Sequence, residues 1–153
     1  MNIVSMETLA AIFTQALLEV VSKISGFELD VISQESDPGF DETIAVMSLN
    51  SSKSGMVFLS ADEACMRILC SFMVGVPEEN ISKTDIEDVL CELVNMTAGN
   101  AKLRLVDTEY MFALSSPFIM SGTGITISAK KRVNVISRQL GNAEISLRLK
   151  VVY

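Results

Sequence analysis

The first part of the chain has apolar residues at the spacing of an amphipathic helix. Between residues 6 and 24 they recur every three or four positions, and Gly26 follows where such a helix would end. Residues 61–73 and 84–106 show the same period. In the last of these segments, Thr84 and Glu87 have the spacing of an N-terminal capping box. The pattern therefore predicts three long helices.

Between and after these segments, the pattern shortens to the alternation that is typical of strands. The first such stretch is at residues 27–33, and the next two, 43–49 and 56–60, form a predicted hairpin. Five more stretches follow the third helix: 110–114, 118–121, 125–128, 133–138 and 144–152. The length of 153 residues fits one domain. We therefore expect a single α+β domain over residues 1–153, with a mostly antiparallel sheet packed against long helices.

Two helical segments of the chain resemble each other. Residues 17–26 align without gaps on residues 90–99, which places Glu19 opposite Glu92 and Ser22 opposite Asn95. The similarity predicts a pseudo-two-fold internal repeat in which each half presents a comparable helix.

The charge balance limits the classes of partner. The chain has 12 basic and 19 acidic residues, which give a net charge of -7. Nucleic-acid binding needs clustered Lys and Arg, so we expect no nucleic-acid partner. The apolar runs look too short to cross a bilayer, and Glu7 stands where a secretory signal would be basic. These features predict a cytoplasmic protein without a membrane partner.

The sequence contains no histidine, which removes several kinds of chemistry. Ser-His and Cys-His nucleophiles, imidazole bases and the usual zinc sites all require that residue. The three cysteines, at positions 65, 70 and 91, lie inside apolar helical patterns and are expected to be free thiols. Catalysis would therefore depend on carboxylates, amides, Lys, Arg or a metal brought by a partner.

The third predicted helix carries an unusual polar stripe. Five residues fall at steps of four, three, four and three, which places them on one helix face: Asp88, Glu92, Asn95, Gly99 and Lys102. Such a stripe is typical of a solvated helix face. However, Asn and Gly are poor helix formers, and a mid-helix Gly costs up to about 1 kcal/mol relative to Ala. Gly99 also leaves the backbone bare, which favours close approach by another molecule.

These residues also carry a family resemblance. The pattern Asp88-x-x-x-Glu92-x-x-Asn95 resembles that of the CheC/CheX chemotaxis phosphatases, and the residues after it are closest to CheX: Met96-Thr97-Ala98-Gly99-Asn100-Ala101-Lys102. The order of segments is similar along essentially the whole chain. One departure is Pro117, which lies one residue nearer to Asn95 than in the family pattern. The first half has Ser22 in place of the amide, as expected for one working site per chain.

The resemblance implies a protein phosphatase that hydrolyses the aspartyl phosphate of a CheY-like receiver domain. In this family reading, Asn95 orients the attacking water and Glu92 anchors the receiver through its active-site lysine. Asp88, Gly99 and Lys102 would contact the partner. The receiver would supply Mg²⁺, the chain itself would bind no metal, and two chains would form a homodimer through sheet edges.

Two other classes of function are compatible with parts of the pattern. A non-catalytic module of the same fold would bind receivers, or pack in an assembly like the flagellar switch, without hydrolysis. The presence of Asn95 favours the phosphatase over this module. A small-molecule enzyme with Glu92 and Asp88 as an acid/base pair is disfavoured, because both residues lie side by side on one helix.

Overall fold

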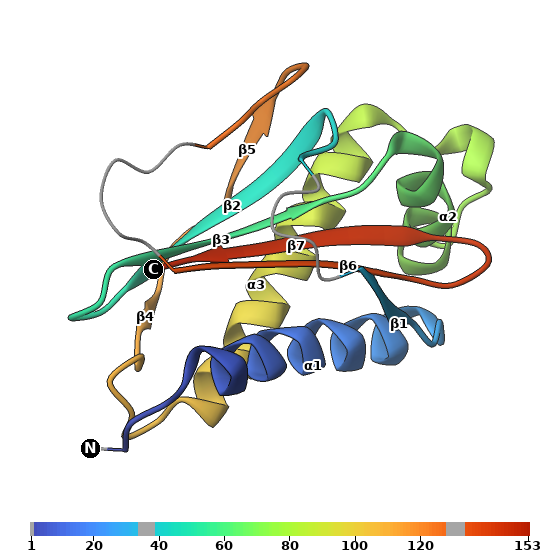
Figure 1. The fold of residues 1–153 in the computed structure, drawn as a ribbon. Coiled ribbons are helices and arrows are strands. Elements are labelled where there is room, and N and C mark those ends of the chain that lie inside the picture. The colour runs from blue at the N-terminus through green and yellow to red at the C-terminus, as the bar shows by residue number, and fades with distance from the viewer. Residues whose placement is uncertain (1, 34–38, 128–133) are drawn as a thin grey trace.

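The computed structural model describes residues 2–33, 39–127 and 134–153 (Figure 1). Within these ranges the chain forms an α+β domain of three α-helices, one short 3₁₀ helix and a seven-stranded sheet. The elements follow in this order: α1 (Met6–Ser25), β1 (Asp30–Ser33), β2 (Thr43–Asn50), β3 (Gly55–Ser60), α2 (Glu63–Val74), η1 (Glu78–Asn80), α3 (Lys83–Arg104), β4 (Ala113–Leu114), β5 (Phe118–Ser121), β6 (Val135–Gly141) and β7 (Ser146–Val152).

The strands pair antiparallel throughout the sheet. Their order is β1-β6-β7-β3-β2-β4, and β5 also pairs with β2. The edge of β2 that faces away from β3 pairs with two short strands. Its first half pairs with β5 and its last two residues pair with β4. Segments far apart in the sequence therefore lie next to one another, since β7 lies between β3 and β6.

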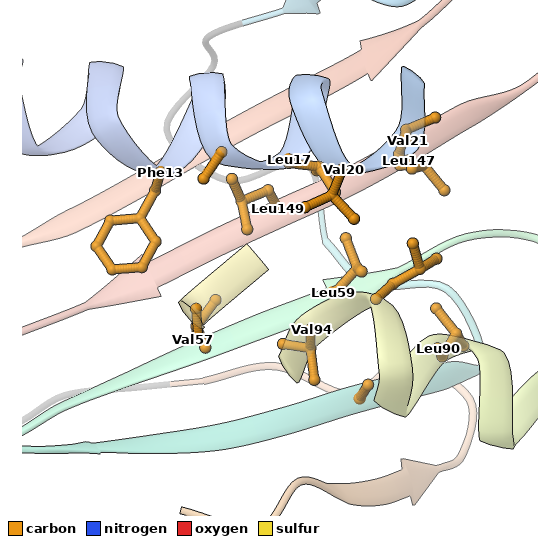
Figure 2. Close-up of a cluster of buried hydrophobic side chains, with 14 of the residues drawn as sticks. Phe13, Leu17, Val20, Val21, Val57, Leu59, Leu90, Val94, Leu147 and Leu149 are labelled. Carbon is orange, nitrogen blue, oxygen red and sulfur yellow. The ribbon is translucent and has the colours of Figure 1, made fainter. Parts of the chain in front are cut away.

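One face of the sheet and the three helices enclose the main core. Figure 2 shows side chains of α1 and α3 meeting those of β3 and β7: Phe13, Leu17, Val57, Leu59, Leu90, Val94, Leu147 and Leu149. All of these side chains are buried. The alternation predicted for the last strand is confirmed, because Leu147, Leu149 and Val151 face this core. A smaller apolar cluster, built on Ile44, Val46 and Phe58, lies on the opposite face of the sheet.

The N-cap of helix α3 lies two residues earlier than the sequence predicts. The capping box is formed by Ser82 and Asp85, not by Thr84 and Glu87. The Ser82 Oγ accepts from the Asp85 backbone N–H at 3.1 Å, and the Asp85 carboxylate accepts from the Ser82 N–H at 2.9 Å. This start also places the apolar side chains of Ile81 and Ile86 on both sides of the cap, and both are buried in the core. Such a pair forms a hydrophobic staple, which the alternative start would lose.

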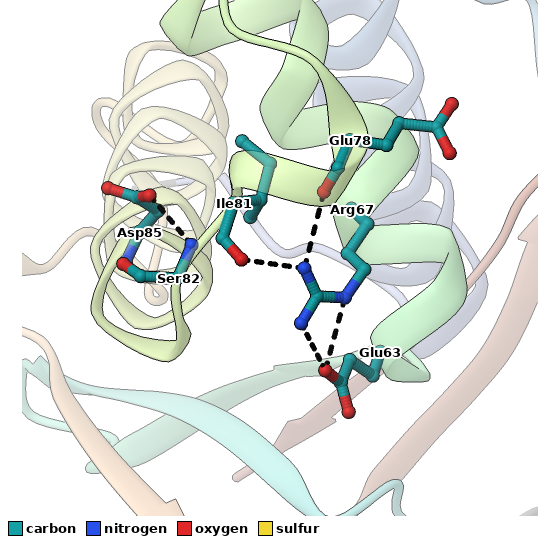
Figure 3. A network of polar contacts seen from close by, with 6 residues as sticks. All are labelled: Glu63, Arg67, Glu78, Ile81, Ser82 and Asp85. Carbon is teal, nitrogen blue, oxygen red and sulfur yellow. Dashed lines mark hydrogen bonds and ion pairs between the residues drawn. The ribbon is translucent and has the colours of Figure 1, made fainter.

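The segment before α3 is tied to α2 by Arg67. Figure 3 shows the Arg67 guanidinium between three groups. It donates to the carboxylate of Glu63 at 2.6 Å and to the backbone carbonyls of Glu78 and Ile81 at 3.2 and 2.6 Å. These bonds fix the turn immediately before the Ser82 cap. The position at which α3 starts is therefore set by both α2 and the turn.

Several predicted strand limits are wrong. Residues 125–127 form no strand, and residue 128 lies outside the described part of the chain. In the 110–114 stretch only Ala113 and Leu114 pair. Strand β6 begins at Val135 and continues to Gly141, beyond the predicted end at residue 138, while residue 133 is not described. An alternating pattern shows which residues suit a strand, but pairing also needs a neighbouring strand in register.

The prediction that the apolar runs are too short to cross a bilayer is wrong for helix α1. Residues Met6–Ser25 are long and apolar enough to cross a membrane by length and composition alone. In the fold, 44% of this apolar window is buried inside the protein. Its buried side, which includes Leu9, Phe13 and Leu17, belongs to the main core. The apolar composition of α1 thus matches its position under the sheet (Figure 1).

Candidate functional site

Helix α3 turns the five-residue polar stripe away from the core. Asp88 and Glu92 are exposed, and the other three residues of the stripe are partly exposed. The opposite side of the helix, whose residues recur at the helical period predicted for residues 84–106, is buried: Ile86, Val89, Leu90, Leu93, Thr97, Ala98, Ala101 and Leu105. The sequence therefore predicted both faces of α3 correctly.

The side chains of the stripe have no partners within the described residues. None of Asp88, Glu92, Asn95 and Lys102 forms a side-chain hydrogen bond or ion pair there. Other acidic residues behave differently: Glu63 is held by Arg67 and Glu109 by Lys53. The Lys53 ammonium beside Glu109 lowers the pKa of that carboxyl group. The carboxylate of Glu92 and the carboxamide of Asn95, one helical turn apart, are therefore available to another molecule.

Gly99 has no structural requirement for glycine. A Cβ atom placed on this residue meets nothing within 4 Å, so the site has open space. Its φ angle is not positive, in contrast to Gly26 and Gly75 at the ends of α1 and α2. Alanine would therefore fit here and would favour the helix. Neither packing nor backbone conformation explains why this position carries no side chain.

The corresponding pair on α1 is not available. The Arg104 Nη2 donates to both carboxylate oxygens of Glu19 at 2.7 Å, and the Asn100 side chain donates to the same group at 3.1 Å. These hydrogen bonds, led by that from Arg104, lower the pKa of Glu19. The hydroxyl of Ser22 donates to Glu28 at 2.5 Å. The side chains on α1 that align with Glu92 and Asn95 are thus already engaged within the chain.

Sequence analysis missed this network between α1 and α3. A weak signal was present, since Gln15 with Glu19, and Asn100 with Arg104, each lie one helical turn apart. However, the two pairs are far apart in sequence, so only the fold brings them together.

The cysteines and a cavity beside α3 do not contribute to the stripe. All three cysteines are free, and burial is the main cause that raises the pKa of each thiol, to about 11 for Cys70. A cavity of about 670 Å³ lies between the start of β2, the end of β5 and the starts of α2 and α3. Its lining includes Lys83 and Ile86 but neither Asp88 nor Glu92. This cavity therefore does not contain the two carboxylates as an acid/base pair.

The arrangement on α3 suits recognition and positioning more than covalent chemistry. A carboxylate binds a cation, and a carboxamide one turn away both donates and accepts hydrogen bonds. In the described residues, no group of three or more His, Cys, Asp or Glu side chains is placed to hold a metal ion. Pro117 lies half-buried just before β5.

Comparisons with known structures agree with this architecture. The CheX protein of Vibrio vulnificus has a TM-score of 0.80 with 19% identity, and the alignment covers 94% of each chain. The CheX protein of Desulfovibrio desulfuricans has a TM-score of 0.77 with 21% identity, covering 94% of this chain and 97% of that one. A complex of CheX, CheY, BeF₃ and Mg²⁺ from Borrelia burgdorferi matches with a TM-score of 0.74, 18% identity, and coverage of 93% and 96%.

No match was found among curated protein sequences. A family model, however, covers the helix that carries the stripe. The family model described as chemotaxis phosphatase CheX matches residues 43–139, well over half of the chain and all of α3. The chain therefore belongs to the CheX family of chemotaxis phosphatases.

Proposed function

We propose that this chain is a protein phosphatase that hydrolyses the aspartyl phosphate of a CheY-like receiver domain. The observation that carries the proposal is the pair of Glu92, which is exposed, and Asn95, which is partly exposed, on α3 of a CheX-family chain. Neither side chain has a partner within the described residues. A related CheX protein has been solved together with CheY, BeF₃ and Mg²⁺, which supports a receiver as the partner.

Asn95 is the residue that positions the attacking water. Hydrolysis of an aspartyl phosphate requires a water oxygen in line with phosphorus and the leaving carboxylate. The water oxygen forms the new bond to phosphorus, the aspartate carboxylate leaves, and the proton of the water passes to phosphate or solvent. Because an acyl phosphate has a good leaving group, no nucleophilic side chain is needed. The carboxamide of Asn95 holds the water by donating to it and accepting from it.

Glu92 anchors the receiver. Its carboxylate lies one helical turn before Asn95 on the same exposed face. A receiver lysine beside the phosphorylated aspartate would pair with this carboxylate and fix the distance over which Asn95 reaches the water. Asp88 extends the acidic edge, Lys102 contributes a cation at the other end, and Gly99 allows the two backbones to approach closely.

The metal ion would come from the receiver, and this chain would act as a dimer. Mg²⁺ would be held by the acidic pocket of the receiver, since the described residues of this chain offer no converging cluster of ligands. The chain would act in the cytoplasm as a homodimer.

A receiver-binding module without hydrolysis is the alternative, because the open face of α3 would support binding alone. Asn95 distinguishes the two functions.

Asn95→Ala should abolish most of the stimulated hydrolysis without unfolding the protein. The side chain makes no hydrogen bond within the described residues, and alanine favours helix. Loss of the positioned water should lower the rate by about 100-fold. The measurement is phosphate release from a phosphorylated receiver, with circular dichroism to confirm the fold. Asn80→Ala, at an exposed asparagine outside the stripe, is the matched control. A wild-type rate in folded Asn95→Ala protein would contradict the mechanism.

Glu92→Lys should weaken binding to the receiver more than Glu92→Gln does. The reversed charge would face the receiver's lysine, and like charges across an interface cost several kcal/mol. Affinity for a receiver loaded with BeF₃ and Mg²⁺ can be measured by calorimetry at low salt. Glu79→Lys makes the same change of net charge at an exposed residue of η1 and should bind like wild type. Equal affinities of the two Glu92 variants would show that this residue does not meet a cation.

Gly99→Ala should separate stability from function. A methyl group enters open space there, so the free energy of unfolding should rise by up to about 1 kcal/mol. If the receiver approaches this backbone closely, the same methyl group should weaken binding, and Gly99→Leu should weaken it further. Denaturant unfolding and binding are measured on the same variants. Unchanged binding by both variants would rule out close approach at Gly99.

A further inference from the structure

Large apolar side chains are exposed around the C-terminal end of α3. Four residues, which we call the apolar end, are 92%, 78%, 51% and 52% exposed: Ile3, Leu103, Val106 and Met111, respectively. The chain segments that carry them are joined here. The N–H of Asn2 donates to the Asp107 carbonyl at 3.0 Å, and that of Met111 donates to the Thr108 carbonyl at 3.2 Å. In Figure 1 the N-terminal segment, the end of α3 and the start of β4 meet at the lower left.

Leu103 continues the polar stripe of α3. It lies four residues after Gly99 and eight after Asn95, which places all three on adjacent turns of one face. At 1.5 Å per residue, Leu103 is about 12 Å along the helix axis from Asn95. A typical protein interface of ~800 Å² per partner is roughly 30 Å across. A receiver centred on Glu92 and Asn95 would therefore cover Leu103 as well.

The polar stripe needs an apolar neighbour to bind a protein with useful affinity. Polar and charged contacts such as those of Asp88, Glu92 and Lys102 contribute mainly specificity and association rate. Affinity comes largely from a desolvated, well-packed apolar centre. At the N-terminal end of α3, the exposed residues next to the stripe are polar: Ser82, Lys83 and Thr84. The C-terminal end is where α3 offers apolar surface in continuity with the stripe.

We propose that the apolar end, with Leu103 as its main contact, binds the receiver domain while Glu92 and Asn95 act on its phosphorylation site. This inference rests on the proposed function, since it uses the same partner on the same helix. Single exposed apolar residues are common on protein surfaces. Here four such residues lie on chain segments that are joined at the end of α3, and Leu103 lies next to the stripe that is offered to the partner. Leu103 thus determines affinity, whereas Asn95 determines the rate of hydrolysis.

The test compares Leu103→Ser with two controls. Leu103→Met keeps the apolar surface, and Val74→Ser removes a similar exposed apolar side chain from the end of α2. Binding of each purified full-length variant to the CheY-like receivers of the same organism, loaded with BeF₃ and Mg²⁺, is titrated without hydrolysis. We expect Leu103→Ser to bind about tenfold more weakly than wild type. Leu103→Met and Val74→Ser should bind within about twofold of wild type. At saturating phosphorylated receiver, the turnover rate of Leu103→Ser should stay within about twofold.

Each outcome supports or overturns the inference. If wild type binds a receiver and Leu103→Ser binds equally well, Leu103 is not a contact and the inference fails while the proposed function stands. If no receiver binds wild type, both fail. Sedimentation of each variant without receiver shows whether this surface instead binds a second copy of the chain. A loss of self-association in Leu103→Ser with unchanged receiver binding would assign the apolar end to a second copy of the chain, contrary to the proposal.

Discussion

The burial of one apolar stripe of α3 is the constraint on which the site depends. Leu90, Leu93, Ala98 and Ala101 are completely buried between the sheet, α1 and α2. Because each helical residue rotates the side chain by about 100°, this packing fixes which residues face outward. Turning α3 by one residue would push Glu92 toward the core, and burying an unpaired carboxylate costs several kcal/mol. The core of the fold therefore determines the direction in which Glu92 and Asn95 point.

Both ends of α3 are held by contacts with other elements. The Ser82 cap and Arg67 fix the start of the helix, and Glu19 of α1 holds Asn100 and Arg104 near its end. Exposed ion pairs of this kind contribute less than about 1 kcal/mol each, so their main effect is on position. Between these ends, Asn95 and Gly99 are poor helix formers, and tertiary packing supplies the helical stability that the local sequence lacks. The working face is thus carried by a helix that the rest of the fold stabilises.

The parts of this account that were predictable from sequence are those that depend on local periodicity. The three helices, the two faces of α3 and the alternation in β7 follow from side-chain spacing along one element. The start of α3 was misplaced because Ser82 and Thr84 each have an acidic residue three positions later, and the burial of Ile81 chooses between them. The strand expected at residues 125–128 does not form in its described part, residues 125–127, because pairing depends on neighbours that the local pattern does not specify.

The pair of Glu19 and Arg104 was not predictable for a related reason. Its residues lie on two helices that come together only when the core forms, so no local pattern links them. The exposure of Leu103 likewise depends on where the chain places the end of α3. In contrast, Glu92 and Asn95 were identifiable because their spacing, their place on one helix and the family resemblance all indicate the same face.

The central claim is that the exposed face of α3 makes this chain a catalyst of receiver dephosphorylation. The most direct test is the loss of phosphate from CheY-like receivers of the same organism, with this chain present in sub-stoichiometric amount and Mg²⁺ in excess. The account predicts that at least one receiver loses its phosphate several-fold faster than by its own hydrolysis, over many turnovers. An unchanged rate for every receiver, with folded wild-type protein, would contradict it.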